Sequence, residues 1–350
     1  MTKKRVCVCG HFGFGHNLLN GQTVKTKILT EELERALGVN EVQKIDTSGK
    51  FKAVLRLPFT VPFAMMHSHN LVILPAYKGI RLIAFLIAFW KIFFRHCTIH
   101  YTVVGAWLPR FMSTKPLLRY FVRHSIDYIY AETSTMKEQL CRTGIHNVLI
   151  MPNCKKLDTL RKNDLVLKHN EPLRLCTFSR IMKMKGIVEA ADVVKTINKE
   201  CGRTVFTLDI YGPVWPADQE WFDAAQTTFS SAVRYCGMVE FNQSVNVLKK
   251  YFMLIFPTRF ATEGVPGTLI DAYAAGLPVL AARWESFADV VNENVTGFGY
   301  TLDDYDEMKA CLMDIATHPD RVERMRVNCI EKAAEFVPES VCQTLISHLK

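Results

Sequence analysis

The segment from Tyr251 to Glu285 places the strongest constraint on how this chain can fold. It reads YFMLIFPTRFATEGVPGTLIDAYAAGLPVLAARWE. The short apolar run Met253 to Phe256 leads into a polar loop, and a helical pattern then runs from Pro266 to Gly276. Proline favours the first helical turn, and glycine favours the position just after the last one. The next apolar run, Leu277 to Ala281, completes the strand, loop, helix and strand that form one βαβ step of a parallel sheet.

The same alternation of short apolar runs and helical patterns continues along the chain, which predicts an α/β protein with doubly wound parallel sheets. A length of 350 residues exceeds what one core usually holds, so we expect two domains. The polar, poorly periodic stretch 156–172 is the predicted linker between domains at 1–155 and 173–335. The runs that we predict to be strands are 5–9, 71–74, 98–104, 128–131, 148–151, 173–178, 207–211, 254–256 and 278–281. The predicted helices are 22–37, 80–94, 186–200 and 320–350, the last interrupted near Pro338.

Cysteine usage and the start of the chain bear on location. The 11 cysteines follow no regular framework, and only Cys7 and Cys9 lie close together, in a predicted buried strand. Buried thiols of this kind behave as small apolar groups. The basic start, MTKKRVCVCGHFG, lacks the long apolar stretch of a secretory signal. We therefore expect reduced cysteines and a cytoplasmic protein, with association to the inner face of a membrane as a further option.

Charge is concentrated in the first half of the chain. Residues 1–150 hold 20 Lys and Arg against eight Asp and Glu, and no acidic residue lies between Asp46 and Asp127. Such a one-signed region suits an anionic partner. The same region contains nine successive apolar residues, Leu82 to Trp90, too few to span a bilayer and bulkier than a nucleic-acid site needs. We expect an anionic membrane surface as partner and no nucleic acid.

Two interpretations of residues 80–94 stay open. In one, the helix is packed on both sides inside a domain. In the other, one face lies on the core and the opposite face enters the membrane interface, where Arg81, Lys91 and Arg95 reach lipid phosphates.

Two carboxylates bracket the helix that follows Pro266. Glu263 precedes the helix and Asp271 lies eight positions later within it, so both flank an N-terminus whose free amides favour an anion. The segment resembles the acidic motif of glycosyltransferase family 4, the retaining sugar-nucleotide transferases with the GT-B fold. Glu263 matches the first glutamate of that motif, and Asp271 replaces the second with a side chain one methylene shorter.

This resemblance implies two Rossmann-like doubly wound domains that face a central cleft, with a C-terminal helix at 336–350 packing back on the first domain. It also implies that Glu263 binds hydroxyls of the donor sugar and that Asp271 binds the ribose of the nucleotide. Gly267 and Thr268, at the start of the helix, are implied to bind the donor as well. The family does not usually need a bound metal, so we expect none and no other cofactor.

A second motif, Ser179 to Gly186, follows a predicted strand and precedes a helix. It resembles the donor-phosphate motif of the same family, in which Arg180 and Lys185 hold the diphosphate. Fixed cations aimed at the charge that develops on a departing diphosphate lower the barrier to transfer. The resemblance therefore makes Glu263, Arg180 and Lys185 the catalytic residues.

The first domain holds two weaker signals. The loop after the first strand contains Gly13 and Gly15 but has neither the dinucleotide fingerprint nor the Walker spacing. Glycines there permit close approach to a phosphate or sugar, as in the N-terminal loop of the family. The segment Tyr101 to Pro109 is expected to face the cleft, with Gly105 and Trp107 as acceptor-binding candidates. The family often has a histidine near this position, and the nearest residues in this chain are not histidine, so no catalytic histidine is assigned.

The function implied by the resemblance is transfer of a sugar from a nucleoside diphosphate sugar to a saccharide, with retention at the anomeric carbon. The acid-free, apolar first domain suggests a lipid-linked saccharide acceptor in the biosynthesis of an envelope or capsular polysaccharide. Two alternatives stay open from the sequence. One is a nucleotide-sugar 2-epimerase of the same fold, which needs no acceptor. The other is a non-catalytic module that binds membrane or nucleic acid through the basic half.

Overall fold

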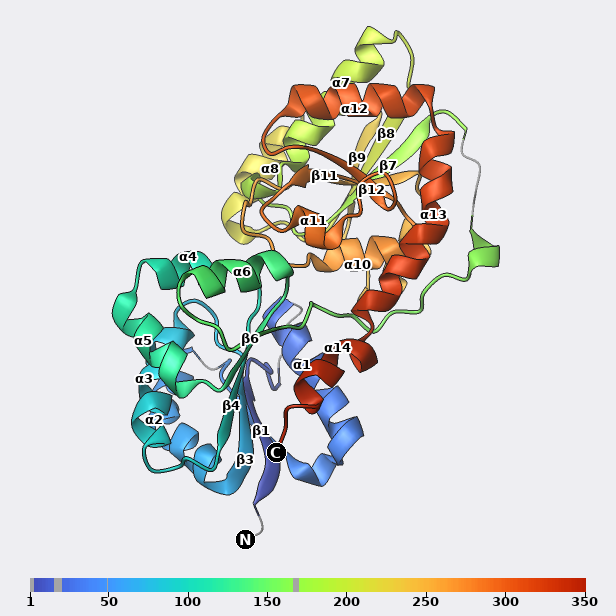
Figure 1. Ribbon diagram of the computed structural model, residues 1–350. Coiled ribbons are helices and arrows are strands. Elements are labelled where there is room, and N and C mark those ends of the chain that lie inside the picture. Colours follow the sequence, from blue (N-terminus) through green and yellow to red (C-terminus); the bar gives the residue numbers. More distant parts are fainter. Residues whose placement is uncertain (1–2, 16–20, 49, 166–169) are drawn as a thin grey trace. The chain divides into compact units, whose positions relative to one another are not determined.

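The computed structural model describes residues 3–15, 21–48, 50–165 and 170–350, so part of the predicted linker, 166–169, lies outside the described residues. The chain divides into two compact units. The first consists of Met1–Lys156 with Phe336–Lys350, and the second of Leu157–Glu335. Each unit contains a six-stranded parallel sheet flanked by helices (Figure 1). The predicted α/β class with doubly wound sheets is confirmed.

The sheet of the first unit has the strand order β2-β1-β3-β4-β5-β6. Its strands are β1 (Lys4–Gly10), β2 (Val42–Asp46), β3 (Ser68–Ile73), β4 (Thr98–Thr102), β5 (Tyr128–Ala131) and β6 (Val148–Ile150). Its helices are α1 (Gly21–Leu37), α2 (Lys50–His67), α3 (Gly79–Lys91), α4 (Leu108–Ser113), α5 (Pro116–Ser125), α6 (Ser134–Arg142) and α14 (Pro338–Ile346).

Side chains of β1 alternate between two separate cores, as expected for a strand covered on both faces. Val6 and Val8 belong to a core with apolar residues of α1 and α14. Cys7 and Cys9 belong to the other core, which α2, α3 and α5 cover. Both thiols are buried, in agreement with their expected role as small apolar packing groups. All 11 cysteines of the chain are free.

The sheet of the second unit has the order β12-β11-β10-β7-β8-β9, with β7 and β10 at its centre. Its strands are β7 (Leu173–Phe178), β8 (Phe206–Tyr211), β9 (Val233–Gly237), β10 (Met253–Phe256), β11 (Val279–Arg283) and β12 (Gly297–Thr301). Its helices are α7 (Ile187–Glu200), α8 (Gln219–Gln226), α9 (Ser244–Leu248), α10 (Gly267–Ala274), α11 (Phe287–Val290), α12 (Tyr305–Thr317) and α13 (Asp320–Ala333).

The strands predicted from apolar runs are confirmed. The elements that were not predicted include β2, β12 and α2. Helix α2 contains Pro58 and Pro62, and proline inside a pattern normally argues against a helix. Strand β12 contains Gly297 and Gly299, which weaken a strand signal. The glycine is needed here, because a Cβ on Gly297 would lie 2.3 Å from the carbonyl oxygen of Val279 on the neighbouring strand.

Candidate active site

The loops that follow β7 and β10 meet at the carboxyl edge of the second sheet. These two strands are hydrogen-bonded neighbours at the point where the strand order reverses, and ligands of open α/β sheets bind outside the strand ends at such a point. The amide of Arg259, in the loop after β10, donates to the carbonyl oxygen of Met184, in the loop after β7, at 2.9 Å. Topology thus joins two motifs that lie about 80 positions apart in sequence.

Gly186 allows these two loops to approach closely. It has a φ of 64°, and a Cβ built on it would lie 2.0 Å from the carbonyl oxygen of Pro257. Gly212, after β8, is similar, with a φ of 137° and a Cβ position 1.9 Å from the carbonyl oxygen of Ser179. A side chain at either position would push backbone against backbone, so both glycines set the shape of the loop that carries Arg180 and Lys185.

Lys185 and Glu263 form an ion pair between the two loops. The Lys185 Nζ contacts Glu263 Oε1, and their side chains are 16% and 18% exposed. The Thr258 hydroxyl donates to the same carboxylate oxygen at 2.9 Å. The ammonium also lies 5.3 Å from the ring centroids of Phe256 and of Phe260, a distance at which an aromatic face attracts a cation. Three sets of contacts therefore position this lysine and glutamate at the surface of the sheet edge.

Arg180 lies in the same loop as Lys185, but it is held differently. Its guanidinium sits 5.1 Å from the ring centroid of Trp215, which is itself 41% exposed. The residue after Arg180 forms an isolated bridge with Val214, so this part of the loop follows the end of β8. Both cations of the motif thus emerge at one end of the second sheet, and only Lys185 is ion-paired with Glu263.

Helix α10 begins beside this loop without a capping side chain. Its N-cap is Pro266, which makes no side-chain cap bond, so the first amides, starting at Gly267, lack that partner. The Thr268 hydroxyl is buried, and no hydrogen-bond partner for it occurs among the described residues. Such a helix start can accept an anion.

Asp271 lies further along α10 and is only 1% exposed. Its Oδ1 accepts a hydrogen bond from the Ser244 hydroxyl at 3.0 Å. The shorter side chain is therefore already engaged with α9, and the predicted ribose contact requires a ligand that reaches this buried carboxylate. That role stays a prediction.

The loop of the first unit that contains Gly13 and Gly15, the glycine loop, binds the carboxylate of Asp46. The amides of Phe12, Gly13 and Phe14 donate to Asp46 at 2.9, 3.3 and 3.0 Å. Partial burial alone would raise the pKa of the Asp46 carboxyl, but bonds from Ser48 and from these amides outweigh it and lower the pKa to about 2. The Gly13 amide thus already donates to Asp46. A contact between this loop and the nucleotide sugar would have to use a group other than that amide. Gly15, with a φ of 80°, is exposed.

Gly105 and Trp107 lie in the segment after β4. The Gly105 amide donates to Glu132 Oε1 at 3.2 Å, and that carboxylate is ion-paired with Lys25 at 2.7 Å, with both side chains at most 4% exposed. The Trp107 indole donates to the carbonyl oxygen of Val104 at 2.8 Å, and its ring is partly buried against the core. The acceptor role of both residues stays a prediction.

A metal site is not evident among the residues that the structure describes, since none of their His, Cys, Asp and Glu side chains gather in groups of three with suitable geometry. The expectation that no metal is needed stays a prediction.

Residues 172–318 match the family model described as "Glycosyl transferases group 1". This segment, which lies within the second unit, thus belongs to the group 1 glycosyltransferases. This match covers both loops of the candidate site, from Ser179 to Gly186 and from Pro257 to Pro266. The resemblance suggested by the two motifs is thereby confirmed at the level of the family.

Individual proteins are similar to this chain at low sequence identity. The amylovoran biosynthesis glycosyltransferase AmsK of Erwinia amylovora is 22% identical over 151 residues, which are 42% of this chain and 37% of that protein. Anabaena HepE, solved in complex with UDP and glucose, has a TM-score of 0.72 at 12% identity over 98% of both chains. Sucrose-phosphate synthase from Thermosynechococcus elongatus has a TM-score of 0.76 at 13% identity, over 99% of this chain and 98% of that one. The chain thus has the GT-B fold.

Three residues that contact the predicted site residues, Thr258, Asp46 and Glu132, were not predicted from the sequence. Thr258 lies two residues after the end of β10, where a hydroxyl can reach the loop, but threonine there is too common to signal a site. Asp46 ends a strand that was not predicted. Glu132 follows β5 directly, and its position at a carboxyl strand end was the one available signal.

Proposed function

We propose that this protein is a retaining glycosyltransferase that transfers a sugar from a nucleoside diphosphate sugar to a saccharide acceptor in polysaccharide biosynthesis. One observation carries the proposal: Lys185 and Glu263 are paired at the switch point of the second sheet, beside the uncapped start of α10. A cation, a carboxylate and a helix start in this arrangement fit a diphosphate and the hydroxyls of its sugar. The name of AmsK supports the assignment to polysaccharide biosynthesis.

The diphosphate of the donor would lie at the start of α10, near Gly267 and Thr268, with Arg180 and Lys185 as its cations. Binding of the diphosphate would place a second anion beside Lys185, in addition to the Glu263 carboxylate with which Lys185 is ion-paired in the structure. Glu263 would then accept hydrogen bonds from hydroxyls of the donor sugar, while Thr258 keeps its carboxylate in place. The nucleoside would extend toward Asp271, the candidate for the ribose hydroxyls.

In the proposed reaction the bond between the anomeric carbon and the phosphate oxygen breaks, and the bonding pair leaves with the phosphate. The cations Arg180 and Lys185 stabilise the charge that develops on this leaving group. The acceptor hydroxyl forms the new bond on the same face of the sugar, and its proton moves to the departing phosphate. The step therefore needs no separate protein base.

We propose a lipid-linked saccharide as the acceptor, bound by the first unit near Gly105 and Trp107. The support is the composition of that unit, which is basic and rich in exposed apolar side chains. This acceptor would place the protein at the cytoplasmic face of a membrane.

A ligand screen by thermal shift tests the donor. Uridine, guanosine, adenosine and thymidine diphosphates and their sugars are added separately, because a ligand that binds only the folded state raises the melting temperature. A uridine diphosphate sugar is the first candidate, since HepE, which has the same fold, was solved with UDP and glucose. The proposal requires one base to stabilise the protein, and a flat response to all of them would overturn it.

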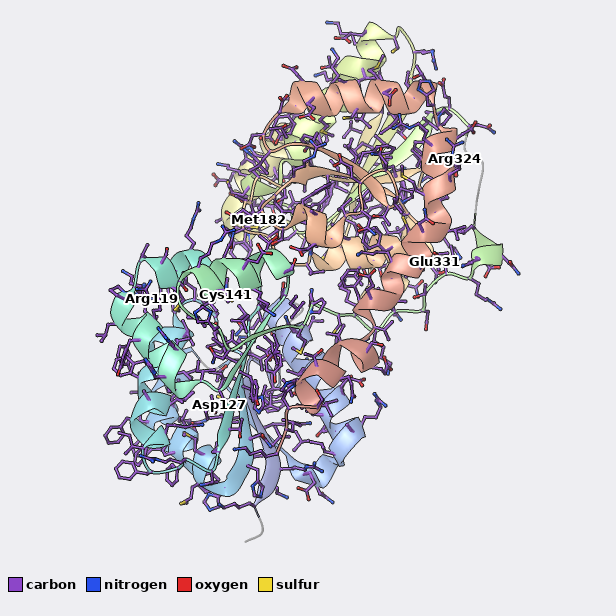
Figure 2. The ribbon with its side chains drawn as sticks, viewed as in Figure 1. Arg119, Asp127, Cys141, Met182, Arg324 and Glu331 are labelled. Atoms are coloured by element: carbon purple, nitrogen blue, oxygen red, sulfur yellow. The ribbon has the colours of Figure 1, made fainter. Side chains whose placement is uncertain are left out.

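Two variants then test the site. Glu263→Gln and Lys185→Ala should each lower turnover at least about tenfold while the protein stays folded, because hydrogen bonds to charged groups contribute about 1.5–3 kcal/mol. The matched controls are Glu331→Gln and Lys162→Ala, which break an exposed ion pair in the same unit. Glu331 is labelled in Figure 2. Unchanged turnover in Glu263→Gln would remove that residue from the mechanism. Conversion of the donor without any acceptor would identify a 2-epimerase instead.

A further inference from the structure

Three neighbouring helices of the first unit expose apolar side chains on the side away from the sheet. Helix α3 contacts both α2 and α5, and all three cover the same core. The exposed members of this surface include Phe59 and Phe63 of α2, Phe85 and Phe89 of α3, Phe93 in the turn after α3, and Tyr120 of α5. We call this surface the α2/α3/α5 face.

The exposed rings form ridges with helical spacing. Phe85 and Phe89 of α3 and Phe93, just after it, follow one another at intervals of four. Ile83 and Ile87 of α3, on its opposite side, are buried. Phe59 is 77% exposed and Phe93 is 64% exposed, so these rings stand in solvent. The interpretation in which residues 80–94 are packed on both sides is therefore wrong. Contiguous exposed apolar surface of this kind marks an interaction site.

Positive charge accompanies these rings. Arg56, Arg95 and Arg123, on or next to the same three helices, are exposed. The chain has no Asp or Glu between Asp46 and Asp127, and Asp127 is ion-paired with Lys91 at 2.5 Å. Lys91, predicted to reach lipid phosphates, is thus already bonded, whereas the exposed arginines are the cations open to an anionic partner. Figure 2 shows Arg119 on α5, within the same acid-free segment.

We propose that the α2/α3/α5 face docks on an anionic lipid bilayer, with its aromatic ridges in the interface and its arginines on the lipid phosphates. Among the described residues, no helix is both long and apolar enough to cross a membrane. An amphipathic surface that combines bulky apolar and basic side chains binds in the plane of the interface. The inference deepens the proposed function by naming the surface on which a lipid-linked acceptor is met.

Charge favours a bilayer over a second copy of this chain. In a two-fold dimer the same patch occurs on both subunits, so the arginine-rich face of one copy would meet that of the other. An anionic surface supplies the missing negative charge, and each Lys or Arg near it strengthens binding roughly fivefold.

Vesicle co-sedimentation of the full chain tests the inference. The vesicles contain phosphatidylcholine alone or phosphatidylcholine with phosphatidylglycerol. The wild type should bind only the second kind, and the triple variant Phe59→Ser/Phe89→Ser/Phe93→Ser should lose at least about tenfold in partition. Arg56→Gln/Arg95→Gln/Arg123→Gln should lose about as much and remove the dependence on phosphatidylglycerol. The control is Val39→Ser, because Val39 is an apolar residue of the same unit, 68% exposed and outside the face.

Three outcomes would overturn the inference. They are absence of binding to phosphatidylglycerol vesicles, equal loss in the Val39→Ser control, and a concentration-dependent dimer that the aromatic variant abolishes while vesicle binding stays unchanged. Donor binding by thermal shift, measured on the same variants, separates this inference from the proposed function. Loss of vesicle binding with an intact donor response supports the docking surface. Unchanged vesicle binding in both triple variants, with an intact donor response, would also overturn the docking surface and leave only the transferase.

Discussion

Replacing Gly186 with alanine should both destabilise the second unit and weaken donor binding. Two features of position 186 require glycine. Its φ of 64° disfavours any side chain, and a Cβ there would lie 2.0 Å from the carbonyl oxygen of Pro257. The left-handed conformation costs alanine about 1–2 kcal/mol. Forcing a methyl group into a tight contact adds about 1–3 kcal/mol. The expected loss is therefore about 2–5 kcal/mol in the free energy of unfolding.

Gly202→Ala is the matched control for this experiment. Gly202 has a φ of 62° in the same unit, but a Cβ there would meet nothing within 4 Å. It should lose only the conformational part, about 1–2 kcal/mol. Thermal unfolding followed by circular dichroism compares the two, since 1 kcal/mol corresponds to about 2–4 °C for a domain of 150–250 residues.

The second readout is affinity for the nucleoside diphosphate that stabilises the wild type. The methyl group can be accommodated only if the loop that carries Lys185 moves away from the loop that carries Glu263, so Gly186→Ala should bind the donor at least about tenfold more weakly. Gly202→Ala should bind it normally. Equal melting temperatures for the two variants, or equal donor affinities, would refute the argument that close loop approach at Gly186 builds the site.

Two predictions concern the first unit. Lys25→Met should lower the free energy of unfolding by about 3–5 kcal/mol, because it leaves the Glu132 carboxylate buried without the ammonium of its ion pair. Adding Glu132→Gln should recover much of this loss. Strictly additive losses in urea unfolding would contradict the coupling. His100 should make stability depend on pH, because burial lowers its pKa to about 3 in the folded chain. In the unfolded chain His100 binds a proton below about pH 6.5, whereas in the folded chain it stays neutral over this range. The free energy of unfolding therefore falls by about 1.4 kcal/mol per pH unit below about 6.5. His100→Gln should flatten this part of the curve, and an unchanged slope in urea unfolding between pH 6.5 and 5 would exclude the histidine.

Apolar runs between turn residues were enough to find most strands, because a strand covered on both faces must be apolar along its length. The run Leu173 to Phe178 and the run Met253 to Phe256 are examples, and both strands are confirmed. The helix that contains Pro58 and Pro62 could not be found in this way. Its existence depends on packing of residues such as Val61 and Met65 into the core, which outweighs the local cost of proline.

The residues of the candidate site were recognisable in the sequence because the two segments that carry them resemble motifs of glycosyltransferase family 4, and each segment follows a predicted buried strand. Which of them interact was decided by tertiary structure alone. The pairing of Lys185 with Glu263 depends on β7 and β10 being neighbours at the sheet centre, although nearly 80 positions separate the two residues. The bond from Ser244 to Asp271 and the three amides on Asp46 likewise join segments that are distant in sequence.

The amino-acid order by itself determined that this chain forms α/β units with charged loops after buried strands, because strand hydrophobicity, glycine and proline placement and loop charges are local properties. Only the folded chain decided that α3 buries one side and exposes the other, that Lys91 is paired and that the glycine loop closes on Asp46. Those outcomes depend on which segments the strand order of each sheet brings into contact. The strand order is a property of the whole fold, so the residues next to each position in the sequence do not specify it.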